Sequence, residues 1–251
     1  MAVAEHLVAT TRARARLLEP QWAQWLWERM RRLIPEALSN LLMPDHLHMV
    51  APPGARVRLR QLLAAFTVRY GVRFDVLPAQ PAHSVEIARR MIRYGFVNPV
   101  RAGLVDDAWA WPWSTLRDLG AAAHPIWTPA AAVAQSLRVP AERIVDALTF
   151  AGRRPPQRVP VAAATFDGLR AAVAAALRMP ESDVLTRTLG RRLIVQASAA
   201  IAPPHASRLA EQLGCCERTI RRDRAERHPA LDAVLTCLAD ERLRRGPDAV
   251  R

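Results

Sequence analysis

The stretch from residue 38 to residue 51 constrains the fold more than any other part of the sequence. Leu38 to Met43 and His46 to Ala51 are short, mostly apolar runs, and Pro44-Asp45 stands between them. Proline and aspartate are typical turn residues, and short apolar runs bounded by such residues favour β-strands. We therefore expect two strands joined by a tight turn, so that this half of the chain contains a sheet.

Helical segments flank these strands. Residues 17–33 and 59–70 place apolar side chains at helical spacing, which predicts two amphipathic helices. A third helix is expected from Ser84, a capping residue, to about Asn98. Pro99 should end it, because the residue before a proline avoids the helical conformation. Residues 77–83 carry two prolines and are expected to be irregular, so the predicted fold class is α+β.

Two histidines on the second strand form the first candidate site. Alternate side chains of a strand point to the same face, so His46 and His48 stand side by side while Leu47 and Met49 point into a core. Two imidazoles in this arrangement can bind one divalent cation and leave positions for water and a phosphate oxygen. The alternative is a pair of surface histidines on an edge strand, and the pattern is too short to decide between them.

Tyr94 and Asn98 form the second candidate site. They lie four residues apart on the predicted third helix and therefore share a face. A tyrosine hydroxyl can attack a DNA phosphorus and hold the strand as a phosphotyrosine ester, provided that a metal or a base assists the protonated phenol. The amide oxygen of Asn98 is a candidate third metal ligand. The alternative is a half-buried tyrosine followed by an asparagine that ends the helix.

The two patterns occur in one chain, and together they resemble a known family. They read Met43-Pro44-Asp45-His46-Leu47-His48 and Tyr94-x-x-x-Asn98-Pro99-Val100-Arg101-Ala102-Gly103-Leu104-Val105. This combination resembles the REP-associated tyrosine transposases, which are HUH-type relatives of the small insertion-sequence transposases that act on single-stranded DNA. The segment Trp111-Pro112-Trp113-Ser114-Thr115 is similar to a Tyr-Pro-Trp-Ser-Ser segment of that family. The resemblance covers about residues 5–120.

The resemblance implies a fold, a chemistry and a partner. The fold would be a ferredoxin-like sandwich in which an antiparallel sheet carries the histidines and a neighbouring helix carries the tyrosine. His46, His48 and Asn98 would bind Mg²⁺ or Mn²⁺, and Tyr94 would be the nucleophile that cleaves and rejoins hairpin-forming single-stranded DNA. The chain departs from the family at Gly95, where isoleucine is usual, and in residues 71–83, which lack an aromatic-rich stretch.

Charge supports a nucleic-acid partner. The chain has 36 basic residues, all of them arginine, against 23 acidic residues, for a net charge of +13. A GC-rich genome explains why arginine replaces lysine, but it does not explain the excess of positive charge. The arginine fork matches phosphate oxygens. Three arginines near the predicted third helix are therefore candidates to hold a DNA backbone, or alternatively form a solvated helix face: Arg90, Arg93 and Arg101.

Residues 205–224 resemble a helix-turn-helix. Ala210 is small where two helices would cross, Gly214 suits the turn, and Ile220 would pack the second helix on the first. The second helix presents a basic face suited to the major groove, with candidate DNA-binding residues Arg218, Thr219, Arg221, Arg222 and Arg224. Residues 166–196 resemble the lead-in helices of the DNA-binding domain of the chromosomal replication initiator. The alternative is a basic helical hairpin without a DNA role.

Composition divides the chain into three expected parts. Residues 1–120 form the HUH transposase domain, residues 121–160 an Ala/Pro-rich helical linker, and residues 161–251 a helical domain that binds duplex DNA. The three cysteines have no metal-ligand spacing, which favours a reduced, intracellular setting. No stretch reaches the ~18 apolar residues of a membrane span. We expect a soluble, cytoplasmic, nucleoid-associated bacterial protein without a membrane partner.

Three functions are therefore weighed. The first is an active single-strand transposase with an added duplex-binding module. The second is a domesticated DNA-binding regulator that is catalytically weak or inactive. The third, hydrolysis of another phosphoester by His46 and His48 alone, leaves the motif from Tyr94 to Pro99 unexplained. The sequence leaves open the DNA target, the metal, the specificity of the helix-turn-helix, and whether the protein is a monomer or a homodimer.

Overall fold

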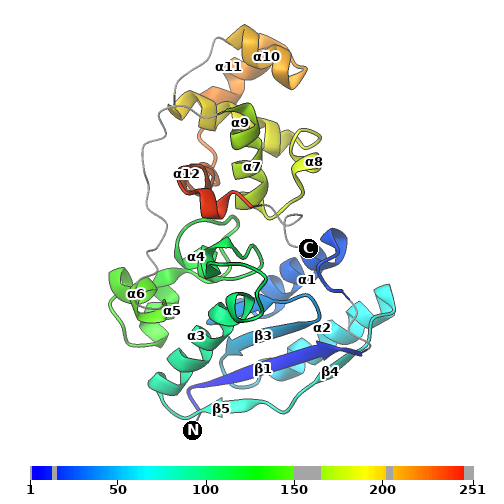
Figure 1. Cartoon of the computed structure of the whole chain (residues 1–251), viewed down its shortest axis with the longest axis vertical. Coiled ribbons are helices and arrows are strands. Elements are labelled where there is room, and N and C mark those ends of the chain that lie inside the picture. Colours follow the sequence, from blue (N-terminus) through cyan, green and yellow to red (C-terminus); the bar gives the residue numbers. More distant parts are fainter. Residues whose placement is uncertain (1, 13–15, 150–164, 202–205, 246–251) are drawn as a thin grey trace. The chain divides into compact units, whose positions relative to one another are not determined.

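The chain forms two compact units (Figure 1). Its structure is a computed structural model that describes residues 2–12, 16–149, 165–201 and 206–245. The first unit contains the described residues of 1–120 and 126–155, and the second contains those of 121–125 and 156–251. The first unit is α+β, and the described part of the second is helical. Residues 152–156, expected in the linker, and His205, expected in the helix-turn-helix, lie outside the described residues.

An antiparallel five-stranded sheet forms the centre of the first unit. Its strands are β1 (Ala4–Thr11), β2 (Ser39–Leu42), β3 (His46–Ala51), β4 (Phe74–Val76) and β5 (Gln80–Ala82). The strand order is β2-β3-β1-β4, and β5 also pairs with β1. β1 is therefore central, with β3 along one edge and β4 and β5 in succession along the other. The two strands predicted around Pro44-Asp45 are confirmed.

Helices cover both faces of this sheet. α1 (Pro20–Leu33) and α2 (Ala55–Tyr70) lie on one face, and α3 (Val85–Arg101) lies on the other (Figure 1). His48 contacts Asn98 of α3, so the alternation along β3 turns Leu47 and Met49 toward the other two helices. Both of these side chains are fully buried. The sheet thus has an apolar face toward α1 and α2 and a mixed face toward α3, where His48 lies beside the buried residues Leu41 and Val50.

The edge next to β1 differs from the expectation for residues 77–83. The sequence predicts an irregular stretch, but β5 pairs with β1 there, and Pro81 lies opposite Glu5. A proline cannot donate a backbone hydrogen bond, so it is tolerated in a strand at the edge of a sheet. The predicted start of the third helix is confirmed, because the Ser84 hydroxyl accepts a hydrogen bond from the amide of Ile87 at 3.2 Å.

The end of α3 also differs from the prediction. Pro99 does not end the helix, which continues to Arg101. A proline ring inside a helix meets the carbonyl of the residue four positions earlier, and here that residue is Gly95. Glycine has the greatest backbone freedom, so the helix can adjust at this point. The φ angle of Gly95 is not positive, and a Cβ atom added to this residue would meet nothing within 4 Å.

We expect Gly95→Ala to raise the free energy of unfolding of the first unit by about 0.5–1 kcal/mol, because alanine restricts the unfolded chain and has room in the folded one. Urea unfolding followed by tryptophan fluorescence would measure it. All seven tryptophans lie between residues 22 and 127, so the signal reports on the first unit. A loss of stability would instead show that α3 needs glycine at the position four residues before Pro99.

Buried polar contacts hold the segment that follows α3. Its short helices are η2 (Ala108–Ala110), α4 (Leu116–Leu119), α5 (Ala130–Ser136), η3 (Ala141–Arg143) and α6 (Ile144–Leu148). Asp118 is 2% exposed and accepts hydrogen bonds from the amides of Trp127 and Thr128 at 3.1 and 3.2 Å. The Trp127 indole donates to the carbonyl of Ile34 at 3.1 Å. These bonds attach residues 126–149 to the first unit.

The second unit is a packed set of helices. They are α7 (Phe166–Leu177), α8 (Glu181–Val184), α9 (Thr188–Ile201), α10 (Ala206–Leu213), α11 (Glu217–Ala225), α12 (Leu231–Ala239) and η4 (Glu241–Leu243). α9 packs against α7, α11 and α12, and α10 packs against α11. Gly190 allows α9 to approach α8, because an added Cβ would lie 2.1 Å from the carbonyl oxygen of Val184.

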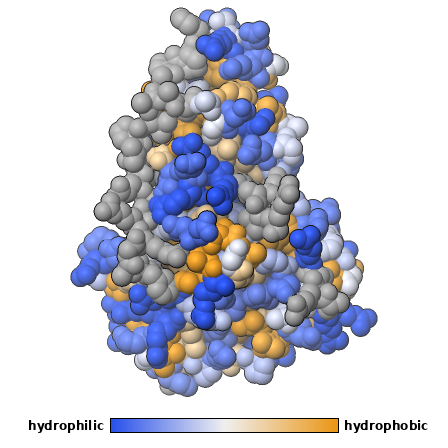
Figure 2. All heavy atoms as spheres, viewed as in Figure 1, coloured by the Kyte–Doolittle hydropathy of each residue, from blue (hydrophilic) through white to orange (hydrophobic). Residues whose placement is uncertain are grey.

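The surface agrees with the arginine-rich composition. Among the coloured residues of the face shown in Figure 2, hydrophilic side chains predominate, with hydrophobic side chains in patches between them. No helix within the described ranges combines the length and apolar character that a bilayer crossing requires.

Candidate functional site

Three histidines gather on the face of the sheet that looks toward α3. His46 and His48 come from β3, and His6 comes from β1, where it lies opposite Val50. Diagonal neighbours on one face of a sheet are within reach of large side chains. The Nε2 atom of His6 lies 3.0 Å from Nδ1 of His48, and the two rings are nearly parallel, with an interplanar angle of 13°. The predicted pair is thus part of a larger cluster.

The remaining nitrogens of His6 and His48 also have partners. The Asn98 amide nitrogen lies 2.7 Å from Nε2 of His48, although the two residues are 50 positions apart in the chain. Nδ1 of His6 lies 3.3 Å from the Gln80 amide oxygen. A continuous row of hydrogen-bonding groups therefore runs from α3 through β3 and β1 to β5.

His46 has a different partner. Its Nδ1 atom lies 2.7 Å from a carboxylate oxygen of Asp45. A carboxylate that accepts a hydrogen bond from Nδ1–H leaves the lone pair of Nε2 free, which is a common way to orient a metal-binding histidine. The ring of His46 is 4.9 Å from that of His48, at 84°. The two predicted histidines are thus adjacent, and each has a separate group against its Nδ1 atom.

Burial keeps the inner histidines neutral. Loss of solvent and, to a smaller degree, the nearby His46 and His6 lower the pKa of His48 to about 3. Burial also lowers the pKa of His6, although its hydrogen bond to Gln80 opposes the shift. Both imidazoles therefore carry no charge at neutral pH. A neutral imidazole has one donor and one acceptor nitrogen, so this site can offer a lone pair to a cation.

Tyr94 stands at the open side of this cluster. It is 45% exposed, and its ring lies 5.9 Å from that of His48 and 6.5 Å from that of His6. It lines a cleft of about 510 Å³, whose other lining residues are His6, Val8, His48, Gln80, Ile87, Arg90 and Met91. Asn98 and Tyr94 lie on one face of α3, as their spacing predicts, and both reach His48.

The three candidate arginines near α3 occupy different positions. Arg90 is exposed and lines the cleft, and Arg101 is exposed with its guanidinium 5.2 Å above the ring of Tyr94. Arg93 is half-buried and donates a hydrogen bond to the carbonyl of Thr149 at 3.1 Å. One turn earlier, Arg89 donates to the carbonyl of Leu137 at 2.7 Å. Arg89 and Arg93 therefore brace α3 against the segment that follows it.

Sequence reasoning missed two members of the cluster, His6 and Gln80. The first strand was not predicted, so no element placed His6 near the motif. A signal was present, because Val8, Thr10 and Thr11 are β-branched, and such residues are enriched in strands. Pairing partners so distant in the sequence do not follow from that composition.

The candidate DNA-binding residues of the second unit lie on α11 (Figure 1). Arg218, Arg221 and Arg222 are exposed, Thr219 and Arg224 are half-buried, and Ile220 is buried. Gly214, in the turn before α11, has a φ of +59°, a left-handed conformation that favours glycine. Arg221 forms an ion pair with Glu217 at 2.8 Å, and Arg222 one with Asp223 at 3.1 Å. Three of the five candidate residues are thus exposed on α11, and two of these three are paired with neighbouring carboxylates.

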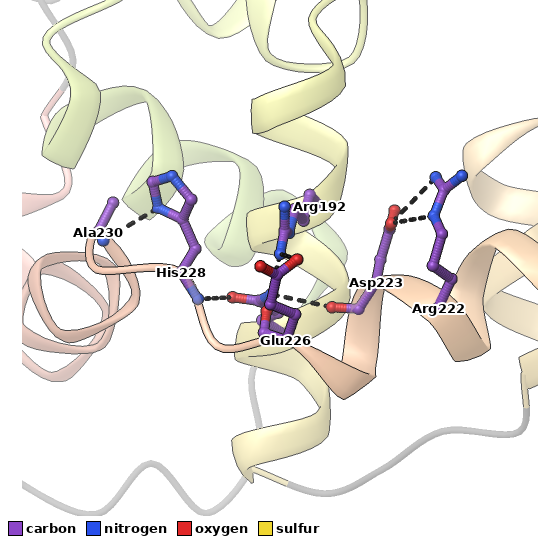
Figure 3. A network of polar contacts seen from close by, with 7 residues as sticks. Arg192, Arg222, Asp223, Glu226, His228 and Ala230 are labelled. Atoms are coloured by element: carbon purple, nitrogen blue, oxygen red, sulfur yellow. Dashed lines mark hydrogen bonds and ion pairs between the residues drawn. The ribbon is translucent and has the colours of Figure 1, made fainter.

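Polar contacts from α9 fix the end of α11 (Figure 3). Gln196 is 4% exposed; its amide donates to the carbonyls of Asp223 and Glu226 and accepts from the amide of His228 at 2.9 Å. Arg192 donates to the Glu226 carboxylate at 2.7 Å. These bonds satisfy backbone groups at the end of a helix and tie the end of α11 to α9.

Comparisons with known proteins give one weak similarity. Neither a protein-family model nor a curated protein matches this chain. Among solved structures, the chain is similar to a REP-associated tyrosine transposase bound to a REP hairpin, with 22% sequence identity. The match covers 51% of this chain and 86% of that chain, with a TM-score of 0.36. Similarity at this level assigns neither a family nor an activity to the chain.

Proposed function

We propose that this protein cleaves and rejoins single-stranded DNA, with Tyr94 as the nucleophile and a divalent cation at His46 and His48. The observation that carries the proposal is that Tyr94 and His48, which come from separate motifs, line one open cleft with their rings 5.9 Å apart. An accessible phenol beside a group able to hold a cation is what phosphotyrosine chemistry requires. The β1-α1-β2-β3-α2-β4 succession and the strand order support a ferredoxin-like sandwich.

The donor atoms fit a hard or borderline divalent cation. The proposed ligands are Nε2 of His46, Nε2 of His48 and the amide oxygen of Asn98. Within the described ranges, no group of three or more His, Cys, Asp or Glu side chains could hold a metal ion. The site therefore depends on an amide and on oxygens from water or DNA, a set that suits Mn²⁺ or Mg²⁺. When bound, the cation would polarise the scissile phosphate and offset its developing charge.

The proposed reaction is a reversible exchange of phosphoester bonds. The Tyr94 hydroxyl oxygen forms a bond to phosphorus as the bond to the 3′ oxygen breaks. The proton lost from the phenol is matched by the proton gained on the departing 3′ hydroxyl. The 5′ phosphate stays joined to Tyr94 until a 3′ hydroxyl of another strand attacks it. No external energy source is needed, because the number of phosphoester bonds is unchanged.

Two arginines are the proposed contacts to the strand. Arg90 lines the cleft and Arg101 lies over Tyr94, so both can contact phosphates on either side of the scissile bond. Arg93 is bonded to the Thr149 carbonyl, and its proposed part is to keep α3 in place. We infer that the chain's contact with DNA in this unit follows the exposed edge of α3.

The second unit would add duplex binding. α10, the turn at Gly214 and α11 have the order of a helix-turn-helix, and α11 carries three exposed arginines. The hydrogen bond from Gln196 to the Asp223 carbonyl would help to fix the position of these side chains on a groove.

Replacing Arg218 and Arg221 together with glutamine should weaken binding to duplex DNA and reduce the slope of log K against log salt by about one for each phosphate that is no longer neutralised. Fluorescence anisotropy of the full chain across a salt series would measure both quantities. The matched control replaces Arg187 and Arg245 with glutamine, because it removes the same two charges from exposed arginines of the same unit outside α11. Equal slopes for the α11 variant and the control would show that α11 does not contact the duplex.

One observation favours a second function, a DNA-binding regulator without turnover. The Asn98 amide nitrogen already contacts Nε2 of His48, the lone pair that a cation would use. A regulator would bind DNA through its arginines and form no covalent product.

A gel assay for a covalent adduct decides between the two functions. The protein would be incubated with hairpin-forming single-stranded oligonucleotides from the flanks of its own gene, with Mn²⁺ or Mg²⁺ and with chelator as the control. Transposase chemistry gives a band that survives denaturation and depends on the cation. A shift in a native gel without such a band would support the regulator.

A further inference from the structure

The feature that the proposed function does not use is His6. Its ring is buried, with 6% exposure, and it meets His48 edge to edge: Nε2 of His6 and Nδ1 of His48 are 3.0 Å apart in nearly parallel rings. That geometry is an in-plane hydrogen bond, which requires one nitrogen to carry the proton and the other the lone pair.

The neighbours of the pair give this hydrogen bond a direction. Asn98 presents its amide nitrogen to Nε2 of His48 at 2.7 Å, so Nε2 is the acceptor and the proton of neutral His48 resides on Nδ1. Nδ1 of His48 then donates to Nε2 of His6. The proton of His6 resides on its Nδ1, which faces the amide oxygen of Gln80 at 3.3 Å. Every donor in the row meets an acceptor.

The hydrogen bonds of this row could also all run in the opposite direction, with every donor paired, but the consequence for His48 would differ. If the side-chain amides of Asn98 and Gln80 were both rotated by 180°, each hydrogen bond would reverse and the proton of His48 would be on Nε2. His48 would then offer no lone pair toward Asn98 and could not bind a cation there. The two orientations of these amides therefore correspond to two chemically distinct states of the site, and an experiment can tell them apart.

We propose that His6 is a positioning residue of the site: its Nε2 atom accepts a hydrogen bond from Nδ1–H of His48 and so holds that ring in the tautomer whose Nε2 lone pair is available to a cation. This inference rests on the proposed function, because the tautomer of His48 matters only if His48 binds a cation. His46 has a similar arrangement, because the Asp45 carboxylate accepts a hydrogen bond from Nδ1–H of His46. Metal-binding histidines generally donate a hydrogen bond from the ring nitrogen that does not bind the metal. Here the acceptor of that bond is an imidazole from the neighbouring strand.

The direct test is the tautomer of His48 in the metal-free protein. Long-range ¹H–¹⁵N correlation spectra at neutral pH distinguish the two nitrogens of each ring, and His48→Gln identifies the His48 signals by their loss. We expect the parent to hold the proton on Nδ1. His6→Phe keeps a ring but removes the acceptor, and should shift His48 toward the other tautomer. His6→Gln offers an amide oxygen and should retain the parent pattern.

A second measurement ties the tautomer to the cation. Mn²⁺ affinity, followed by electron paramagnetic resonance of the free ion, should fall by about 10–100-fold in His6→Phe, the range typical for loss of a group behind a metal ligand. His6→Gln should stay within a few-fold of the parent. Thermal melting of each variant would confirm that it is folded.

The outcomes separate this inference from the proposed function. A parent His48 with its proton on Nε2, or a tautomer that His6→Phe leaves unchanged, would overturn the role of His6. Unchanged Mn²⁺ affinity in a folded His6→Phe protein would do the same. If the tautomer responds to His6 as expected but no covalent adduct forms on DNA, the transposase chemistry fails while His6 keeps its orienting role.

Discussion

Tyr94→Phe should eliminate the covalent adduct with single-stranded DNA while leaving DNA binding nearly unchanged. The substitution removes one hydroxyl from a half-exposed ring and retains the ring contacts with His48 and Arg101. Loss of a covalent nucleophile has reduced the rate by on the order of 10⁶ in a well-studied enzyme, so no product should be visible in a gel. Affinity would be measured in the same samples by native gel shift.

The chain offers a matched control for this experiment. Tyr70 is the only other tyrosine. It lies at the end of α2 among Trp22, Trp25 and Phe66, away from the histidine cluster. Tyr70→Phe should form the adduct at the parent rate. An adduct that persists in Tyr94→Phe, or disappears equally in both variants, would exclude Tyr94 as the nucleophile.

Asp118→Ala should lower the free energy of unfolding of the first unit by about 3–5 kcal/mol, since each buried donor left without a partner costs about 1–3 kcal/mol. Asp118 accepts from the amides of Trp127 and Thr128 and from the Thr128 hydroxyl. A methyl group accepts none of these hydrogen bonds. Water in the vacated space would replace them only in part. Urea unfolding followed by tryptophan fluorescence would give the value.

Two further variants test the cause of this loss. Asp118→Asn keeps one carbonyl oxygen of similar position and should cost clearly less than alanine. Asp106→Ala removes an exposed carboxylate and should change stability by less than about 0.5 kcal/mol. A small effect of Asp118→Ala would show that water replaces the carboxylate, and that the other contacts of residues 126–149 are enough to hold the segment.

The sequence predicts the local parts of the site well, because local parts have local causes. The turn at Pro44-Asp45, the cap at Ser84 and the alternation that turns His46 and His48 to one face depend on neighbours a few residues away. The shared face of Tyr94 and Asn98 depends only on the helical repeat. That the helix reaches the strand was expected solely from the family resemblance, and the hydrogen bond from Asn98 to His48 is consistent with it.

What the sequence does not predict are contacts between distant segments. His6 enters the site through the pairing of β1 with β3, which no short pattern specifies. Buried arginines are a second feature that the sequence does not predict. Most arginines are solvated, and no sequence pattern marks the ones that are buried. Arg117 is fully buried and donates to the carbonyls of Trp109 and Ala110 at 3.0 and 3.1 Å. Arg93 holds a carbonyl in the same way, whereas its position on α3 suggested a DNA contact.

The path of the chain between the two units restricts how this architecture can be rearranged. Residues 121–125 belong to the second unit, where the His124 amide donates to the Ala176 carbonyl at 2.8 Å, but residues 126–149 return to the first. A genetic exchange with one breakpoint after Gly120 would separate α3 from the carbonyls that anchor Arg89 and Arg93. The smallest transferable module containing Tyr94 therefore extends to about residue 149. A chimera with another duplex-binding unit must keep residues 126–149 with the first unit.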